Sequence, residues 1–140
     1  MTLPFAGTEK LSQEDYETLA AFRYELRRFL QSSEQAAKSV GLTPQQHQAL
    51  LAIRADPRHG MTVGEMAEQL FIQPHSASEL ADRLIGLGLV TREPAEDDRR
   101  RTWLRLTSAA VDRLDRLSTT HRAEVVRVRP ALNTILQRLG

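Results

Sequence analysis

A cluster of ionised side chains lies past the middle of the chain, where Asp97 to Arg101 are five consecutive charged residues. Three of them are arginines, whose planar guanidinium groups donate paired hydrogen bonds to phosphates and to the edges of bases. Arginine supplies 17 of the 19 basic residues, and Lys10 and Lys38 are the only lysines. This chemistry suits a nucleic-acid partner. The alternative is a solvated loop in which aspartate and arginine form local ion pairs.

A second group of polar side chains lies between Gln73 and Arg83. Ser76 and Ser78 carry short hydroxyl groups that can bond to base edges or to phosphates. His75 lies at the start of the same segment, where it is either a DNA contact or an ordinary surface histidine. The segment therefore offers hydrogen-bonding groups that suit a nucleic acid.

Two further side chains in this region each have two interpretations. Arg83 either faces a binding partner or pairs with the carboxylate of Asp82 or Glu79. Trp103 alternates with Leu104 in a segment of strand-like composition. We expect Trp103 to pack against the domain, and the alternative is an indole that stacks on a base.

The sequence contains no arrangement that is typical of catalysis or of metal binding. The histidines show neither i,i+4 pairing nor a set of carboxylates suited to a metal. No serine–histidine arrangement indicates a nucleophile, and no glycine-rich loop is present to bind phosphate. The absence of cysteine excludes disulfides, thiolate metal sites and a thiol redox switch. We therefore expect no enzyme, cofactor or metal site. The four histidines are His47, His59, His75 and His121.

The length of 140 residues predicts one compact domain. The formal net charge of +1 indicates no particular partner. Residues Met61–Thr107 contain six arginines and eight acids, so their sum slightly opposes binding to a nucleic acid, whereas the residues after Thr107 contain six arginines and three acids. No apolar run is long enough to cross a membrane, and the first residues show no signal pattern. We expect a cytoplasmic protein with no membrane partner.

Helix signals organise the first part of the chain. Residues 1–10 show no periodic pattern and are expected to form a flexible tail. A long amphipathic helix is predicted to begin at Ser12, in a Ser-x-x-Asp pattern, and to end at Gly41. A second helix begins with Thr43 as its N-cap residue and Pro44 in its first turn.

A helix–turn–helix is predicted next. Thr62 and Glu65 have the spacing of a capping box at the start of a short helix that runs to Leu70. Only three residues separate Leu70 from Pro74, which is placed for the first turn of the following helix, and Gly88 ends that helix. The first helix of such a pair braces the second, which presents its N-terminal half to the major groove.

A short hairpin follows the helix pair. Leu89–Arg92 and Thr102–Leu106 have strand-like composition, and the charged link Glu93–Arg101 joins them. The order of helix, turn, helix and hairpin is that of a winged helix-turn-helix. The fold class is therefore mainly α with a small β-hairpin wing.

The remaining residues predict one more helical region and an association of two chains. A helix begins after Thr107, and Pro130 is expected to break or kink it, leaving a short last helix over Ala131–Leu139. Apolar stripes near Leu11–Leu19 and Val125–Leu139 are too long for the small winged domain to cover. We expect a two-fold dimer to bury them. An intramolecular bundle is the alternative.

Five short motifs follow one another in a recognisable order: Glu65–Leu70, Leu80–Leu84, Leu87–Arg92, Asp97–Arg101 and Leu104–Thr107. Together they resemble the MarR (multiple antibiotic resistance regulator) family of winged helix-turn-helix transcription regulators. The resemblance covers roughly Leu11 to Leu139. It implies a single domain over residues 11–140, with the winged helix-turn-helix at about 43–107 and dimerisation helices at 11–41 and 107–140. It also implies a homodimeric repressor of a pseudo-palindromic operator in double-stranded DNA.

The resemblance implies DNA contacts from the wing and from the second helix of the pair. Asp98 and Arg100 match the family's Asp-x-Arg wing, in which the arginine enters the minor groove and the aspartate holds its guanidinium. Arg99 and Arg101 would add contacts to a groove or to phosphates. Gln73 and Glu79 depart from the residues common in the family. The recognition-helix candidates are Gln73, His75, Ser76, Ser78, Glu79 and Arg83.

The resemblance further implies a small aromatic or phenolic effector, bound between the dimer helices and the winged domain, that relieves repression. The candidate ligand-binding residues are Tyr24, Arg28, His47 and His121. Because the chain has no cysteine, the thiol-oxidation mode of the family's peroxide-sensing branch is excluded.

Two other functions fit the sequence. The first is a winged-helix module that binds proteins, which the acidic balance of Met61–Thr107 permits. The second is a DNA-binding regulator that responds to no ligand. A salt titration separates the first from a DNA-binding protein, because DNA binding weakens steeply as salt rises.

Overall fold

The computed structural model describes residues 10–96 and 101–139. They form two compact units, one containing the residues up to Gln35 together with those from Thr119 onward, the other containing Ala36–Ser118. The tail expected over residues 1–10 lies outside the described residues except for Lys10. The tip of the expected wing, Asp97–Arg100, also lies outside them.

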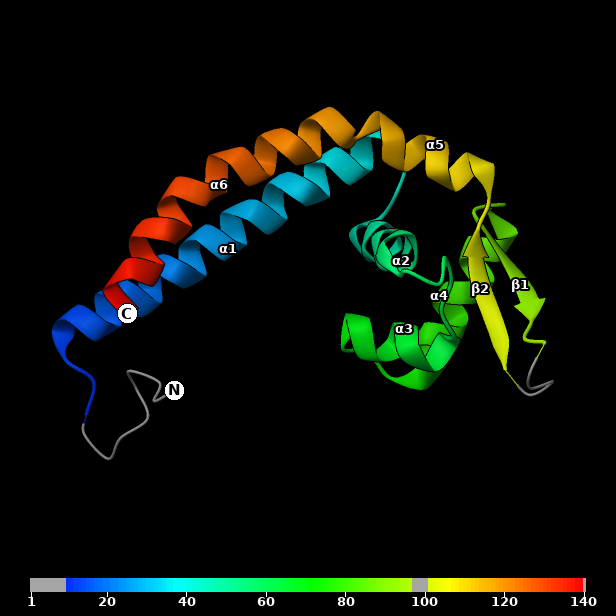
Figure 1. Cartoon of the computed structure of the whole chain (residues 1–140), viewed down its shortest axis with the longest axis horizontal. Coiled ribbons are helices and arrows are strands. Elements are labelled where there is room, and N and C mark those ends of the chain that lie inside the picture. Colours follow the sequence, from blue (N-terminus) through cyan, green and yellow to red (C-terminus); the bar gives the residue numbers. More distant parts are fainter. Residues whose placement is uncertain (1–9, 97–100, 140) are drawn as a thin grey trace. The chain divides into compact units, whose positions relative to one another are not determined.

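The first unit contains most of α1 (Gln13–Ser39) and of α6 (Ser118–Leu139), which lie side by side in Figure 1. The predicted start of α1 is confirmed: the backbone N–H of Asp15 donates to Ser12 Oγ at 3.1 Å, and that of Ser12 donates to the Asp15 carboxylate at 3.0 Å. No helix in the described part of the chain is long and apolar enough to cross a membrane.

A buried carboxylate links the two helices of this unit. Glu124 on α6 is 3% exposed and accepts hydrogen bonds from Ser33 Oγ at 3.0 Å and Ser32 Oγ at 3.5 Å, both on α1. Arg127 on α6 donates to Ser32 Oγ at 2.9 Å. A buried charge needs such partners, so these contacts fix α1 against α6 at this level.

The break expected at Pro130 was placed wrongly. α5 (Ser108–Arg116) ends at Leu117, whose backbone N–H bonds back to the carbonyl of Leu114, and α6 then continues through Pro130. Proline removes one backbone donor but holds φ near the helical value, so a helix packed along its length can contain it. The predicted short helix over Ala131–Leu139 is therefore the last part of α6.

The second unit surrounds one hydrophobic core. Its helices are α2 (Pro44–Ala55), α3 (Val63–Leu70), α4 (Pro74–Gly86) and α5, and its strands are β1 (Val90–Pro94) and β2 (Thr102–Leu106). Figure 1 shows α3 and α4 close to the hairpin. The largest fully buried side chains come from α2, α3, α4, β1 and β2, and from Leu89, which directly precedes β1. They are Leu50, Ile53, Met66, Leu84, Leu89, Val90 and Leu104.

The signals at the start of α2 and at the ends of α1 and α4 were interpreted correctly, whereas at the start of α3 the structure shows only the Thr62 half of the expected capping box. Thr43 and Gln46 form a reciprocal capping box at the start of α2, each side chain bonding the other's backbone N–H at 3.1 Å. Gly41 and Gly88 have φ of 75° and 74°, the left-handed conformation that glycine adopts most readily after a helix. These residues set where α1 and α4 stop.

The wing is a two-stranded antiparallel hairpin in which Val90 pairs with Leu106 and Pro94 with Thr102. Its first strand is longer than predicted, because Glu93 and Pro94, assigned to the charged link, belong to β1. The backbone of Met61 exchanges two hydrogen bonds with that of Leu104, at 3.2 and 2.7 Å. This bridge fixes β2 to the segment that leads into α3.

Candidate nucleic-acid interface

α4 buries one face and leaves the other to solvent. Ala77, Leu80, Ala81 and Leu84 are buried, a spacing that places them on one side of the helix. The residues between them project away from the core. All six recognition-helix candidates are exposed: Gln73, His75, Ser76, Ser78, Glu79 and Arg83.

The turn before α4 leaves the helix N-terminus open. Phe71 ends α3 in the left-handed conformation, with φ 55°, and the backbone N–H of Ile72 bonds to the carbonyl of Ala67 at 3.0 Å. Gln73 is the N-cap residue of α4, but its side chain makes no cap hydrogen bond. The first turn of α4 contains no acidic residue. The free N–H groups and the positive end of the helix dipole therefore suit an anion such as phosphate.

The acids near Arg83 have other partners. His75 Nε2 lies 3.2 Å from Glu79 Oε1, and Asp82 Oδ1 accepts from Arg92 Nη2 at 2.7 Å. Among the described residues Arg83 has no ion pair. Of the two interpretations that the sequence left open for Arg83, the structure therefore favours the arginine that faces outward.

Of the four wing residues implied by the resemblance, only Arg101 is described; Asp98, Arg99 and Arg100 lie outside the described residues. Arg101 is exposed, and its Nη2 lies 3.6 Å from Glu65 Oε1 on α3. Its guanidinium carbon also lies 5.3 Å from the centroid of the Trp103 ring. Two contacts thus hold the first residue that follows the wing tip.

Three arginines surround the indole of Trp103, and we call these four residues the Trp103 cluster. Besides Arg101, the guanidinium carbons of Arg58 and Arg105 lie 4.9 and 5.6 Å from the ring centroid. These distances are within the range of cation–π attraction. Trp103 is half-buried and packs inside its own unit, as the sequence analysis expected.

Carboxylates from three parts of the unit pair with the Trp103 cluster. Arg58 donates to Asp56 at 2.9 and 3.0 Å and to the carboxylate of Glu65 at the start of α3. Arg105 donates to Glu93 on β1, and its Nη1 donates to the backbone carbonyls of residues 58 and 59 at 3.0 Å each. The cluster therefore links the base of the wing to the α2–α3 loop and to α3.

These contacts shift the ionisation of the groups involved. Hydrogen bonds from Arg58 lower the pKa of Asp56 to about 2 and lower the pKa of Glu65. The same bonds, first from Asp56 and then from Glu65, raise the pKa of Arg58. Asp56 and Glu65 thus compensate the Arg58 charge, which is not offered to an external anion.

The sequence analysis did not identify Arg58 or Arg105 as functional residues. Arg58 lies in a loop with no periodic pattern, and its partners in α3 and β2 come from other elements of the unit. The one available signal was the single tryptophan placed between two arginines, Arg101 and Arg105, in a segment predicted to be a strand.

The structure brings two of the four predicted ligand-binding residues together. Tyr24 and Arg28 both line a hollow along α1 of about 530 Å³, and Arg28 Nη1 lies 3.9 Å from Glu25 Oε1. His121 does not line this hollow; its Nδ1 lies 3.4 Å from Glu124. His47 belongs to the other unit and is 2% exposed. In the described part of the chain, no group of three histidines or acids could hold a metal ion.

Comparison with known proteins agrees with the winged-helix fold described above. Residues 40–101 match the model of the MarR family. AbsC, a MarR family transcriptional regulator from Streptomyces coelicolor, superposes with a TM-score of 0.74 at 22% identity, over 89% of this chain and 84% of that one. No curated protein matches the sequence.

Two structures solved with DNA share the fold. A MarR family transcriptional regulator from S. coelicolor in complex with DNA gives a TM-score of 0.72 at 18% identity, over 94% of this chain and 88% of that one. The S. aureus MepR–DNA complex gives 0.61 at 21% identity, over 85% and 98%. At these identities the similarity establishes the fold.

Proposed function

We propose that this chain is a homodimeric repressor of operator DNA, because residues 40–101 match the model of the MarR family and the chain shares its fold with MarR family transcriptional regulators. One observation carries the proposal: α4 presents a polar face with an open N-terminus, on the same unit as a β-hairpin. In a winged helix-turn-helix such a helix enters the major groove.

The side chains on α4 then contact different parts of the DNA. Gln73, Ser76 and Ser78 supply hydrogen bonds at the N-terminal end, where base edges are read. Arg83 lies later on the helix and suits a phosphate, since its guanidinium has no acidic partner among the described residues. Glu79 and His75 form an exposed pair that influences which bases α4 can bind.

The wing supplies the second contact. Arg100 enters the minor groove with Asp98 holding its guanidinium, and Arg99 adds a groove or phosphate contact. Arg101, directly before β2, contributes a further contact to DNA, and Glu65 and the Trp103 ring hold its side chain. A narrow minor groove concentrates negative potential, which favours an inserted arginine.

Dimerisation involves the first unit. Both of its helices expose large apolar side chains, including Tyr16 and Leu19 on α1 and Val125, Val126 and Leu136 on α6. A second copy of the chain would bury them and would place two recognition helices on two half-sites. Leu19→Glu should therefore shift the protein toward the monomer in sedimentation velocity, and an unchanged dimer would exclude this face from the interface.

We also propose that a small aromatic or phenolic effector relieves repression by binding more tightly to the form that does not bind DNA. Tyr24 and Arg28 support this proposal, because they line one hollow with an aromatic ring and a cation. His47 and His121 remain candidates on the resemblance alone.

The test of DNA binding is a titration of labelled DNA from upstream of the chain's own gene, followed by fluorescence anisotropy at several salt concentrations. We expect log affinity to fall linearly with log salt. Arg100→Ala should weaken binding without unfolding the protein, while Arg116→Gln, at an exposed position on α5, serves as the matched control. Absence of salt-dependent binding would favour the protein-interaction module instead.

A further inference from the structure

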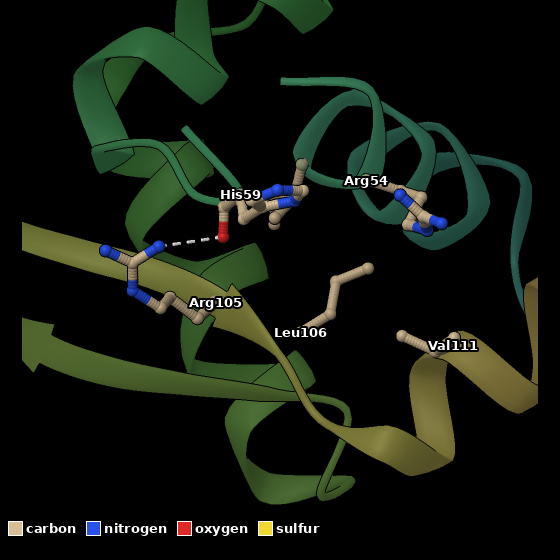
Figure 2. Close-up of a pocket in the computed structure, with 6 residues that line it drawn as sticks. Arg54, His59, Arg105, Leu106 and Val111 are labelled. Carbon is tan, nitrogen blue, oxygen red and sulfur yellow. Dashed lines mark hydrogen bonds between the residues drawn. The ribbon is translucent and has the colours of Figure 1, made fainter. Parts of the chain in front are cut away.

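The winged unit contains a pocket that the proposed DNA contacts do not use. It encloses about 370 Å³, within the range of pockets that hold small ligands. All of its lining residues belong to Ala36–Ser118, and none of them lines the hollow on α1. Figure 2 shows side chains from α2, the α2–α3 loop, β2 and α5 around it. They are Ile53, Arg54, His59, Arg105, Leu106 and Val111.

One part of the lining is apolar. Ile53 is 1% exposed and belongs to the hydrophobic core, while Leu106 and Val111 are half-buried. In Figure 2 Leu106 and Val111 lie near each other below Arg54. A ligand that covered Leu106 and Val111 would remove apolar surface from water, which stabilises the complex.

The other part of the lining is cationic. Arg54 lies in the last turn of α2, a helix without an acidic residue, and forms no ion pair among the described residues. Three carboxylates elsewhere in the unit have arginine partners: Asp56 and Glu65 bind Arg58, and Glu93 binds Arg105. An anion in the pocket would therefore meet the Arg54 charge without a competing acid from these residues.

His59 reaches the pocket from a left-handed backbone position. Its φ is 57°, in a region that side-chain-bearing residues seldom adopt but that histidine, like asparagine and aspartate, adopts more often than the others. Hydrogen bonds hold this conformation, since its N–H donates to the Asp56 carbonyl at 2.9 Å and its carbonyl accepts from Arg105 Nη1 at 3.0 Å. These hydrogen bonds hold the loop so that His59 lines the pocket.

We propose that this pocket binds a small organic anion, with its acidic group at Arg54 and His59 and its apolar body on Ile53, Leu106 and Val111. An arginine and an imidazole donate to a carboxylate or a phosphate ester, and the apolar lining selects against an inorganic ion. The site is distinct from the hollow that contains Tyr24 and Arg28.

Arg105 connects the pocket to the base of the wing. Its side chain lines the pocket while its guanidinium binds Glu93 and two loop carbonyls and lies 5.6 Å from the centroid of the Trp103 ring. A ligand that contacts Arg105 would change the surroundings of the indole. An effect on operator binding through this contact rests on the proposed function, whereas ligand binding itself does not.

The test uses benzoate as the probe, with benzyl alcohol as its neutral analogue and inorganic phosphate as the anion without an apolar body. Trp103 is the single tryptophan, so its fluorescence in the full-length protein reports on the pocket through Arg105. The variants are Arg54→Gln and His59→Asn, the latter chosen because asparagine tolerates positive φ. Arg116→Gln is the control, and circular dichroism checks the fold of each variant.

We expect saturable binding of benzoate that Arg54→Gln weakens by about tenfold or more and His59→Asn weakens by less. Equal binding of benzyl alcohol or of phosphate, or unchanged binding in Arg54→Gln, would overturn the proposal. So would a loss of operator affinity in Arg54→Gln with benzoate binding intact, because Arg54 would then be a DNA contact. Failure of the wild type to bind operator DNA, with benzoate bound, would overturn only the proposed function.

Discussion

The guanidinium carbon of Arg58 lies 4.9 Å from the centroid of the Trp103 ring, and the same guanidinium bonds to the Glu65 carboxylate. Arg58 belongs to the loop between α2 and α3, Trp103 to β2 and Glu65 to α3. One arginine therefore joins the strand that carries the wing to the helix that braces α4. The orientation of the wing depends on this contact as well as on backbone pairing.

The first prediction concerns the ring itself. Trp103→Leu keeps an apolar side chain on β2 but removes the surface that three guanidinium groups contact. We expect the free energy of unfolding to fall by about 1.5 to 3 kcal/mol, since each of the three exposed cation–π contacts contributes on the order of 0.5 to 1 kcal/mol. Urea denaturation measures the change. Trp103→Phe, which retains a ring, should lose less unfolding free energy. Equal losses in the two variants would show that the aromatic ring does not supply the stability.

The second prediction is a loss of stability in acid that depends on Arg58. The folded protein holds the pKa of Asp56 at about 2, below the ordinary 3.8, and lowers the pKa of Glu65. A lowered carboxylate pKa contributes stability that is present above the unfolded value and is lost as pH falls through the folded value. The contribution should therefore disappear from about pH 5 down to about pH 2.

Arg58→Gln provides the control for this pH dependence, because hydrogen bonds from the Arg58 side chain lower both pKa values more than any other contact does. Urea midpoints at neutral pH and at low pH should differ less in Arg58→Gln than in the wild type. An identical pH dependence in the two proteins would contradict the prediction.

The features that could be predicted from the sequence depend on neighbouring residues. Gly41 and Gly88 end helices with positive φ, and the Thr43–Gln46 box begins one, because each device involves residues a few positions apart. The exposed face of α4 follows from helical periodicity in the same way. These signals gave the order of elements and the candidate DNA face.

Features that depend on contacts across the unit could not be predicted. Arg58 meets Trp103 only because the Met61–Leu104 bridge fixes β2 beside the α2–α3 loop. The break expected at Pro130 was wrong for a related reason: a local rule about proline does not include the packing that keeps α6 continuous.

The third prediction concerns the turn between α3 and α4. Phe71 holds φ 55° with a side chain that is 96% exposed, so its ring gains almost no burial while the backbone is strained. Asparagine adopts this conformation more readily. Phe71→Asn should raise the free energy of unfolding by about 0.5 to 1 kcal/mol in a urea titration.

Operator affinity gives Phe71→Asn a second readout. An unchanged affinity would mean that the turn only connects the helices, whereas a fall in affinity with raised stability would assign the exposed ring to DNA. A decrease in stability would contradict the argument from backbone strain.

The fourth prediction concerns an acid on α4, the helix that we propose to face DNA. Asp82 on α4 accepts from Arg92 on β1 at 2.7 Å, which neutralises a carboxylate next to Arg83. Arg92→Gln removes this partner and leaves Asp82 to repel phosphates or to pair with Arg83. We expect operator affinity to fall several-fold at low salt, with the difference shrinking as salt rises.

The double variant Arg92→Gln/Asp82→Asn separates this explanation from a direct contact between Arg92 and DNA. If Arg92 acts by neutralising Asp82, removing both charges restores affinity to near the wild-type value, because no unpaired acid remains beside Arg83. If Arg92 itself binds a phosphate, the double variant stays weak and its salt slope is lower by about 1. Urea midpoints for both variants should stay close to the wild type, since the pair is exposed and surface ion pairs contribute little stability.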